Sequence, residues 1–323
     1  MSLRPQNPRL SAIVPAYNEG AGITDFLQAL HHKLTQHSSD IEIIVINDGS
    51  RDDTSAQVLA MAQQIPCIKL LDFSRNFGKE AALTAGIDHA DGDAVIIIDA
   101  DFQHPINTVD AFIQKWHEGY DMAYGLRTDR ATESGVKRAG VRLFYWLLDK
   151  MSSVNLPEDA GDFRLLDRRV VLALRQLPER SRFMKGLYSW VGFRTCAVPF
   201  QVQERSEGDT AYTFGKLVQL ALTGLVSFSD VPLRMWTFIG LFISSLSLIY
   251  ALYIIVETLV FGADTNGWPT LIVSVLFLGG IQLISIGVLG EYISRIFNEV
   301  KQRPTYLLKY RHGFNETTDR HAP

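Results

Sequence analysis

Four short apolar segments recur along the first hundred residues, and each runs into polar residues at its end. These segments lie within Ser11–Glu19, Ile41–Ser50, Ile68–Leu71 and Val95–His104. After the first of them, apolar side chains recur at the spacing of one helical face, at Ile23, Phe26, Leu27, Leu30 and Leu34. Strands that alternate with helices in this way predict an α/β fold with a doubly wound sheet, whose polar loops gather at one sheet edge.

The fourth segment contains the most specific chemistry. Residues 95–98 are a run of β-branched side chains, which is typical of a parallel strand buried on both faces. Asp99 and Asp101 follow directly, before a turn at Pro105. In open α/β sheets ligands bind at this edge, and two carboxylates there favour a divalent cation that also binds a diphosphate. The alternative is a solvated acidic turn after a core strand.

Two long uncharged stretches lie toward the C-terminal end. Residues 235–256, roughly 22 positions, and 265–290, roughly 26 positions, contain no charged side chain, and each could cross a hydrocarbon core of about 30 Å. A short hydrophilic turn around 262–267 separates them. They predict a transmembrane hairpin with spans at about 235–258 and 268–291, and a pair of buried core helices is the alternative.

Basic residues predict the orientation of this hairpin. Arg234 precedes it, and the turn carries only Glu257 and Asp264. Further basic residues follow it, among them Arg295, Lys301, Arg303, Lys309 and Arg311. Because positively charged flanks stay on the cytoplasmic side, both termini are expected in the cytoplasm.

Two other stretches, 138–151 and 214–228, each have one apolar helical face. Such amphipathic helices can lie in the lipid headgroup layer, although packing against the sheet is the alternative for each. The predicted organisation is an N-terminal domain at 1–212, a juxtamembrane helix at 213–233, the hairpin at 234–294 and a cytoplasmic tail at 295–323.

The composition fits this organisation. The 323 residues are 47% hydrophobic, with a mean hydropathy of +0.06, and their formal net charge of −4 argues against a nucleic-acid partner. Cys67 and Cys196 lie far apart near apolar runs, so we expect buried free thiols and a reducing compartment. The first residues contain no apolar run of the kind found in a signal peptide.

The polar ends of the segments contain no G-x-G-x-x-G and no P-loop motif, which excludes the ordinary dinucleotide and P-loop classes. Instead the chain resembles the inverting glycosyltransferases of the GT-A fold, family 2. It is most similar to the polyprenyl-phosphate subgroup, which includes bactoprenol glucosyltransferases and dolichol-phosphate mannose synthases. The resemblance spans roughly residues 9 to 308 and is carried by 15–19, 47–50, 74–80, 99–105 and 161–167.

The resemblance implies a nucleotide-sugar site. Its expected residues are Pro15, Tyr17, Glu19, Asp48, Lys79, Asp99 and Asp101. Of these, Asp48 is expected at the nucleobase and Lys79 at the diphosphate, although Lys79 could equally be an exposed helix lysine. A divalent cation, Mg²⁺ or Mn²⁺, is expected on Asp99, Asp101 and Gln103, whose oxygens are suitable hard ligands.

The acceptor side is expected to use arginines, whose forked guanidinium groups suit a lipid phosphate. The candidates are Arg127, Arg138 and Arg205, and a headgroup-facing surface position is the alternative for Arg138. The loop at 205–212 has Ala211 where the family usually has lysine. Asp162 matches the region of the family's catalytic acid, with Asp159 as the alternative, and either could instead cap a loop.

The predicted activity is the inverting transfer of one sugar from a nucleotide sugar to polyprenyl (undecaprenyl) phosphate at the cytoplasmic face of a bacterial inner membrane. UDP-glucose is favoured by resemblance, with N-acetylglucosamine, galactose and mannose donors as alternatives. Membrane lipids are expected partners, and related enzymes suggest a homotetramer. A processive polysaccharide synthase would need a Q-x-x-R-W motif, which is absent from the sequence. The hairpin argues against a soluble transferase, and the intact acids argue against a non-catalytic scaffold.

Overall fold

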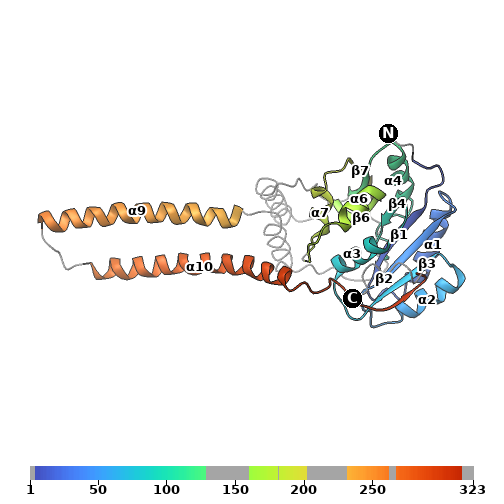
Figure 1. Cartoon of the computed structure of the whole chain (residues 1–323), viewed down its shortest axis with the longest axis horizontal. Helices are drawn as coiled ribbons and strands as arrows, with labels where there is room; N and C mark the ends of the chain where they lie inside the picture. The colour runs from blue at the N-terminus through green and yellow to red at the C-terminus, as the bar shows by residue number, and fades with distance from the viewer. Residues whose placement is uncertain (1–3, 129–159, 181, 202–230, 262–266, 315–323) are drawn as a thin grey trace.

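The computed structural model describes residues 4–128, 160–180, 182–201, 231–261 and 267–314. Within these residues an α/β domain is followed by two long helices that extend away from it (Figure 1). The domain is built on an eight-stranded sheet with the order β7-β5-β6-β4-β1-β2-β3-β8. The predicted interfacial stretches, 138–151 and 214–228, lie outside the described residues.

Six of the strands are mutually parallel, and two run against them. The parallel set is β1 (Leu10–Ala16), β2 (Ile41–Asn47), β3 (Ile68–Phe73), β4 (Ala94–Ile97), β5 (Met122–Arg127) and β7 (Thr195–Phe200). The antiparallel strands are β6 (Ala160–Asp167), which lies between β4 and β5, and β8 (Leu308–His312), which pairs with β3. The predicted doubly wound arrangement is confirmed for β1 to β4, whereas the two antiparallel strands were not predicted.

Helices cover both faces of this sheet. The described helices of the domain are α1 (Ile23–Thr35), α2 (Thr54–Gln64), α3 (Lys79–His89), α4 (Thr108–His117), α6 (Arg168–Arg175) and α7 (Met184–Trp190). The apolar face predicted for 23–34 is confirmed, because all five of its side chains are buried in α1. Substitution of any of these by a polar residue would place an unpaired polar group in the core.

Alternate strand residues supply two separate cores. Val14 and Val45 pack with α1, α2 and α4 on one face, while Ile13 and Ile44 pack with α3, α6 and α7 on the other. This two-sided burial explains why the strands are continuous apolar runs rather than alternating ones.

The chain order creates a crevice at the carboxyl ends of the strands. β1 pairs with β2 on one side and with β4 on the other, so the connections after β1 and β4 lead away in opposite directions. This is the topological switch point at which α/β sheets bind ligands. Because β6 is antiparallel to β4, its first residues, including Asp162, lie at this same edge.

Two long helices, α9 (Val231–Phe261) and α10 (Trp268–Val300), follow the domain and contact each other. Among the described residues, Val273–Val300 is long and apolar enough to cross a membrane, and none of its apolar window is buried by the protein. The apolar part of α9, Phe238–Ile254, is shorter. Helices are therefore confirmed where the sequence predicted two spans.

After α10 the chain returns to the domain. Tyr306 stacks on Phe73, with ring centroids 5.2 Å apart, and its hydroxyl donates to Asp88 Oδ2 at 3.2 Å. β8 then adds a strand to the edge of the sheet beside β3. Residues 308–312, predicted as part of a tail, thus belong to the sheet.

Both cysteine thiols are free, as predicted. Each is half-buried, so the prediction that they are buried is wrong. Cys67 lies in the turn before β3, and Cys196 lies on β7 at one edge of the sheet. Partial burial raises the pKa of the Cys67 thiol.

A buried carboxylate joins three strands at the opposite edge of the sheet. Glu42 accepts hydrogen bonds from Ser11 Oγ at 2.5 Å, Lys69 Nζ at 2.6 Å and the Asp91 amide at 2.7 Å. Burial raises the pKa of Glu42, but these donors and the Lys69 charge outweigh it, so the pKa is lowered overall. The ionised carboxylate is therefore part of the folded state.

We expect Glu42→Gln to lower the free energy of unfolding by about 3 kcal/mol at neutral pH, because it leaves the Lys69 charge uncompensated. Because the pKa of Glu42 is lower in the folded protein than in the unfolded chain, where it is about 4.3, ionised Glu42 stabilises the fold above that pH. This stabilisation is lost as the pH falls through the pKa of the folded state. Thermal unfolding in detergent should thus show a difference in Tm between the wild type and Glu42→Gln that becomes smaller below about pH 4.3. Asp40→Asn, at an exposed carboxylate 3.9 Å from Arg9, is the matched control. An equal loss in both variants would contradict this role for Glu42.

Candidate active site

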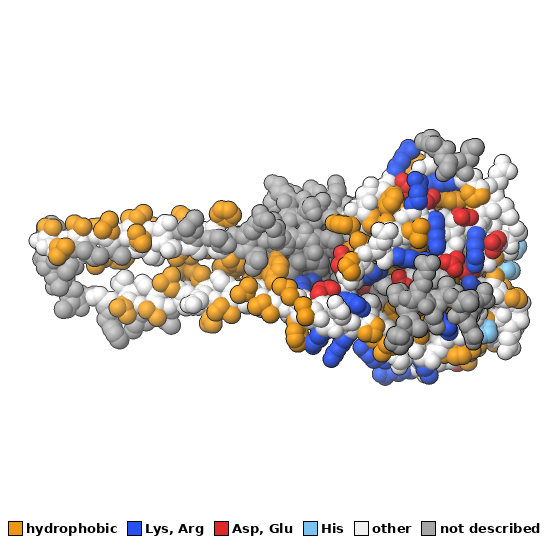
Figure 2. Space-filling view, viewed as in Figure 1, with side chains coloured by type: hydrophobic (Ala, Val, Ile, Leu, Met, Phe, Trp, Pro, Cys, Tyr) orange, Lys and Arg blue, Asp and Glu red, His pale blue; other side chains and the backbone are white. Residues whose placement is uncertain are grey.

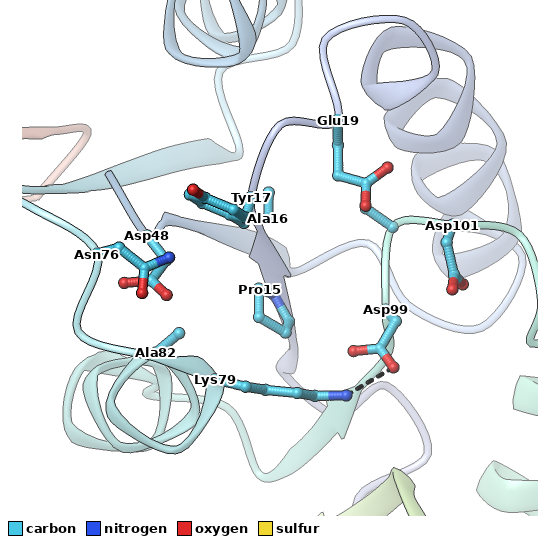
Figure 3. A pocket seen from close by; sticks show the side chains of 11 residues that line it. Pro15, Ala16, Tyr17, Glu19, Asp48, Asn76, Lys79, Ala82, Asp99 and Asp101 are labelled. Carbon is cyan, nitrogen blue, oxygen red and sulfur yellow. Dashed lines mark hydrogen bonds and ion pairs between the residues drawn. The ribbon is translucent and has the colours of Figure 1, made fainter. Parts of the chain in front are cut away.

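A cavity of about 320 Å³ lies at the switch point between β1 and β4. Its lining contains all seven residues predicted for the nucleotide sugar: Pro15, Tyr17, Glu19, Asp48, Lys79, Asp99 and Asp101. Figure 3 shows Asp48 and Asn76 at one end, with Asp99 and Asp101 at the other. The sequence prediction thus named side chains that the fold brings into one cavity of a size suited to a small ligand.

Asp48 organises one end of this cavity. Its two carboxylate oxygens accept the amides of Phe77 at 2.7 Å and Gly78 at 2.9 Å. Burial raises the pKa of Asp48 in spite of these hydrogen bonds. Each oxygen has a second lone pair, so the carboxylate can still accept a hydrogen bond from a ligand.

Two glycines allow the loops to approach each other here. Gly49 has a φ of +66°, and a Cβ on it would lie 2.4 Å from the carbonyl carbon of Arg75. Gly78, with a φ of +96°, turns the chain into α3. A side chain at Gly49 would push the 75–78 segment away from Asp48, because other residues adopt this backbone conformation only at a cost.

Lys79, the first residue of α3, joins two carboxylates from different strands. Its Nζ lies 2.8 Å from Asp99 Oδ2, as drawn in Figure 3, and 3.3 Å from Asp162 Oδ2. Burial lowers the pKa of Lys79, but the negative charges of Asp99 and Asp162 outweigh burial, so the pKa is raised overall. Lys79 is thus a helix lysine that is 45% exposed and also forms ion pairs with both acids of the site.

Asp162 is the third residue of β6 and is almost fully buried, with 11% of its side chain exposed. Burial raises the pKa of Asp162, but the positive charges of Lys79, Lys185 and Arg164 outweigh it and lower the pKa overall. The carboxylate is therefore ionised at neutral pH. Its Oδ1 is buried and accepts no hydrogen bond from the described residues.

The structure adds three polar residues to this site that the sequence analysis did not assign. Glu80 accepts the Met184 amide at 2.9 Å, and burial together with the charge of Asp162 raises the pKa of Glu80 to about 7. His104 Nδ1 lies 3.8 Å from Asp99 Oδ2, and burial lowers the pKa of His104. Arg164 is buried with its guanidinium 3.7 Å from the centre of the Tyr188 ring.

A sequence signal existed for all three of these residues, but not for the residues of α7 that act on them. Glu80, His104 and Arg164 stand inside the motifs that carried the resemblance, next to Lys79, Asp101 and Asp162. Tyr188 and Lys185 lie on α7, and no pattern in the sequence connects that helix with the acids.

The remaining predicted residues fall outside this cavity. Gln103 donates its main-chain amide to Asp101 Oδ1 at 3.1 Å, but its side chain does not line the cavity. Arg127 ends β5, at the same sheet edge, and is exposed. Asp159, Arg138 and Arg205 lie outside the described residues, so their roles stay predictions.

Asp99 and Asp101 present hard oxygen donors at the cavity wall. Among the described residues, no group of three His, Cys, Asp or Glu side chains is close enough to hold a metal ion without further ligands. Two carboxylates fit an ion such as Mg²⁺, which commonly takes one or two carboxylates together with phosphate oxygens of a substrate.

These features define a class: an α/β protein with an acid-lined ligand cavity at the carboxyl edge of its sheet. The chain matches the family Glycosyl transferase family 2 over residues 11–174 and the family GtrB C-terminal hairpin over residues 231–296. The chain therefore belongs to glycosyl transferase family 2, and it is a glycosyltransferase with a membrane-associated C-terminal hairpin.

Relatives share this architecture over nearly their whole length. A prophage-derived bactoprenol glucosyl transferase of Shigella flexneri is 48% identical over 95% of this chain and 99% of its own. A glycosyltransferase of Synechocystis is 47% identical over 93% of this chain and 94% of its own. A mannosyltransferase structure from Pyrobaculum calidifontis covers 91% of this chain and 87% of its own at 16% identity. Its TM-score of 0.48 is too low to support an inference about this chain.

We expect Lys79→Gln to raise the pKa of Asp162, because burial then acts against a weaker positive field. The check is a pH titration of the protein with ¹³C-labelled aspartate carboxyl groups, followed by NMR, with the signal assigned through Asp162→Asn. Lys115→Gln, at an exposed lysine on α4, should leave the titration unchanged. An unshifted Asp162 signal in Lys79→Gln would show that Lys79 does not set its ionisation.

Proposed function

We propose that the protein transfers glucose from UDP-glucose to polyprenyl phosphate, with inversion, at the cytoplasmic face of a bacterial inner membrane. The observation that carries this proposal is the near-complete alignment with proteins named bactoprenol glucosyl transferase, at 47–48% identity. The cavity supports it, because the nucleotide-sugar residues expected from the sequence converge there.

The cavity suggests how the donor is oriented. The nucleobase lies toward Asp48 and Asn76, and the diphosphate lies toward Lys79, Asp99 and Asp101. The Lys79 ammonium group stands at the first residue of α3, where the helix dipole also favours a phosphate. Asp48 is held in place by its own loop amides and therefore selects a donor without rearrangement.

A divalent cation is part of this proposal. Asp99 and Asp101 would hold it, with Gln103 as a further ligand by resemblance, and the cation would neutralise the negative charge that develops on the departing diphosphate. Lys79 would then compensate the charge left over on Asp99 and the phosphates. The distinction between Mg²⁺ and Mn²⁺ is open to direct measurement.

The ionised state of Asp162 favours a positioning role. A phosphate monoester has a second pKa of about 6, so it is mostly dianionic at pH 7 and needs no base. Asp162, whose pKa is lowered by nearby cations, is a poor proton acceptor. We infer that it holds Lys79 and the sugar in place while the phosphate attacks the anomeric carbon. Arg127, Arg138 and Arg205 are proposed for the lipid phosphate.

The membrane arrangement is also a proposal: α9 and α10 both cross the bilayer, and both termini are cytoplasmic. The basic residues that flank the hairpin support it. Cysteine labelling from outside intact cells should reach a probe at Asn266 but not one at Thr317. Labelling at Thr317 would show that the hairpin has the opposite orientation. A homotetramer, suggested by related enzymes, can be tested by the mass of the detergent-solubilised particle.

The function is tested by offering the purified full-length protein radiolabelled sugar nucleotides with polyprenyl phosphate. Glucose should enter an organic-extractable lipid faster than N-acetylglucosamine, galactose or mannose. If another sugar is transferred faster, the proposed donor is wrong but the proposed transfer to polyprenyl phosphate stands. A polysaccharide synthase would instead make a polymer, and a non-catalytic scaffold would transfer nothing, so either result would overturn the proposal.

Asp101→Asn should keep the fold, because the change is nearly isosteric, and should lower the transfer rate at least 100-fold. The reason is the loss of one hard ligand from a two-carboxylate set. EDTA should abolish the transfer activity of the wild type, and added Mg²⁺ or Mn²⁺ should restore that activity. Asp110→Asn, at a carboxylate on α4 outside the cavity, is the control. Full activity in EDTA would remove the metal from the proposal.

Asp162→Asn should lower the transfer rate while the acidic limb of the pH–rate profile keeps an apparent pKa of about 6. That limb then reports the second ionisation of the lipid phosphate rather than the side chain. Rates are compared across pH for both proteins at saturating metal and donor. If the limb disappears in the variant, Asp162 is the titrating base and the positioning role is wrong.

A further inference from the structure

A second cavity lies where the end of α10 meets the catalytic domain. It measures about 560 Å³, and its lining includes five basic side chains: Arg75, Arg180, Arg182, Lys301 and Arg303. Glu80 is the single carboxylate in this lining. Figure 2 shows lysine and arginine side chains gathered at this junction, directly beyond the apolar side chains of the helix.

The five cations outnumber the carboxylates near them, which are Glu80 in the lining and Glu299, whose oxygens accept the main-chain amide of Arg180 at 3.0 and 3.1 Å. None of the five forms an ion pair with a carboxylate of the residues that the structure describes. Arg180 Nη1 donates to the Arg303 carbonyl at 3.0 Å, and Arg182 Nη2 donates to the Leu177 carbonyl at 2.6 Å. Those contacts fix the guanidinium groups without cancelling their charge, so the cavity holds a positive potential that an anion would relieve.

The position of the cavity points to the origin of that anion. The apolar segment Val273–Val300 ends at the cavity, and Asn298, Lys301 and Arg303 belong to its last turn and the residues after it. Phosphate groups of membrane lipids lie at this depth relative to a spanning helix. Guanidinium forks suit phosphate oxygens, and basic side chains near a membrane surface attract anionic lipids.

This cavity has a different lining from the catalytic one, although Glu80, whose pKa is raised by burial and by the charge of Asp162, lies on its wall. The segment 74–81 passes between them, with Asn76 and Lys79 lining the catalytic cavity and Arg75 and Phe77 lining the second. The acceptor phosphate must meet the donor sugar beside Asp99 and Asp162. It therefore cannot react from the far side of this segment.

We propose that the second cavity binds the phosphodiester headgroup of an anionic bilayer lipid, at a site distinct from the donor and acceptor sites. The inference is carried by five cations that form no ion pair within the described part of the chain and that lie at the end of the apolar helix. It goes beyond the transfer reaction and does not depend on which sugar is transferred.

The test uses full-length protein in detergent micelles that contain defined fractions of phosphatidylglycerol or phosphatidylcholine, with bound lipid counted by native mass spectrometry. The wild type should retain phosphatidylglycerol in preference to phosphatidylcholine. Lys301→Gln with Arg303→Gln should bind phosphatidylglycerol about 30-fold more weakly, since each basic residue contributes about fivefold. Lys301→Gln alone should weaken binding about fivefold. Lys115→Gln with Arg194→Gln removes the same charge outside both cavities and should bind as the wild type does.

Competition separates the possible sources of phosphate. Neither inorganic phosphate nor undecaprenyl phosphate, at the concentration of phosphatidylglycerol, should displace the bound lipid. Displacement by undecaprenyl phosphate would make the cavity an acceptor site, and displacement by inorganic phosphate would make it a general phosphate site; each overturns the proposal. Equal phosphatidylglycerol binding by wild type and double variant also overturns it. Because binding is read without turnover, a failure of sugar transfer would leave this result intact.

Discussion

One ammonium group, on Lys79, compensates two carboxylates that reach it from different strands. Asp99 follows β4, and Asp162 lies near the start of the antiparallel strand β6. Without that positive charge the two acids would repel each other, and burial would favour protonation of Asp162. Lys79 is placed by the left-handed turn at Gly78, whose amide is held by Asp48. The two ends of the catalytic cavity are thus connected through one short segment of main chain.

Local pattern was sufficient to predict β1 to β4 and α1, whereas the seven predicted residues of the cavity lining were named from the family resemblance. Each apolar run stops at the residue where its strand meets the crevice, so the position of Asp99 or Asp48 follows from the run itself. The antiparallel strands could not be predicted in this way. β6 and β8 are placed by pairing with strands far away in sequence, and neither has a periodic signal that distinguishes its direction.

The same reasoning explains which site residues were missed. Arg164 and Tyr188 contact each other only because α7 packs beneath β6, a relation that depends on the tertiary fold. Gln103 was inferred from resemblance, and its side chain lies outside the cavity lining, while its amide binds Asp101. Spacing along a loop does not determine which side chains turn inward, because a loop has no fixed period. Phe102, with a φ of +56°, shows how sharply this loop turns.

The return of the chain to β8 has a consequence for biosynthesis. Synthesis proceeds from the N-terminus, so α9 and α10 are made before Leu308–His312. Until then the outer edge of β3 lacks its partner, and an open strand edge is prone to pairing with other chains. The sheet of the N-terminal domain is therefore completed only after the whole hairpin has been synthesised, so release of the nearly finished chain and closure of this strand edge are coupled.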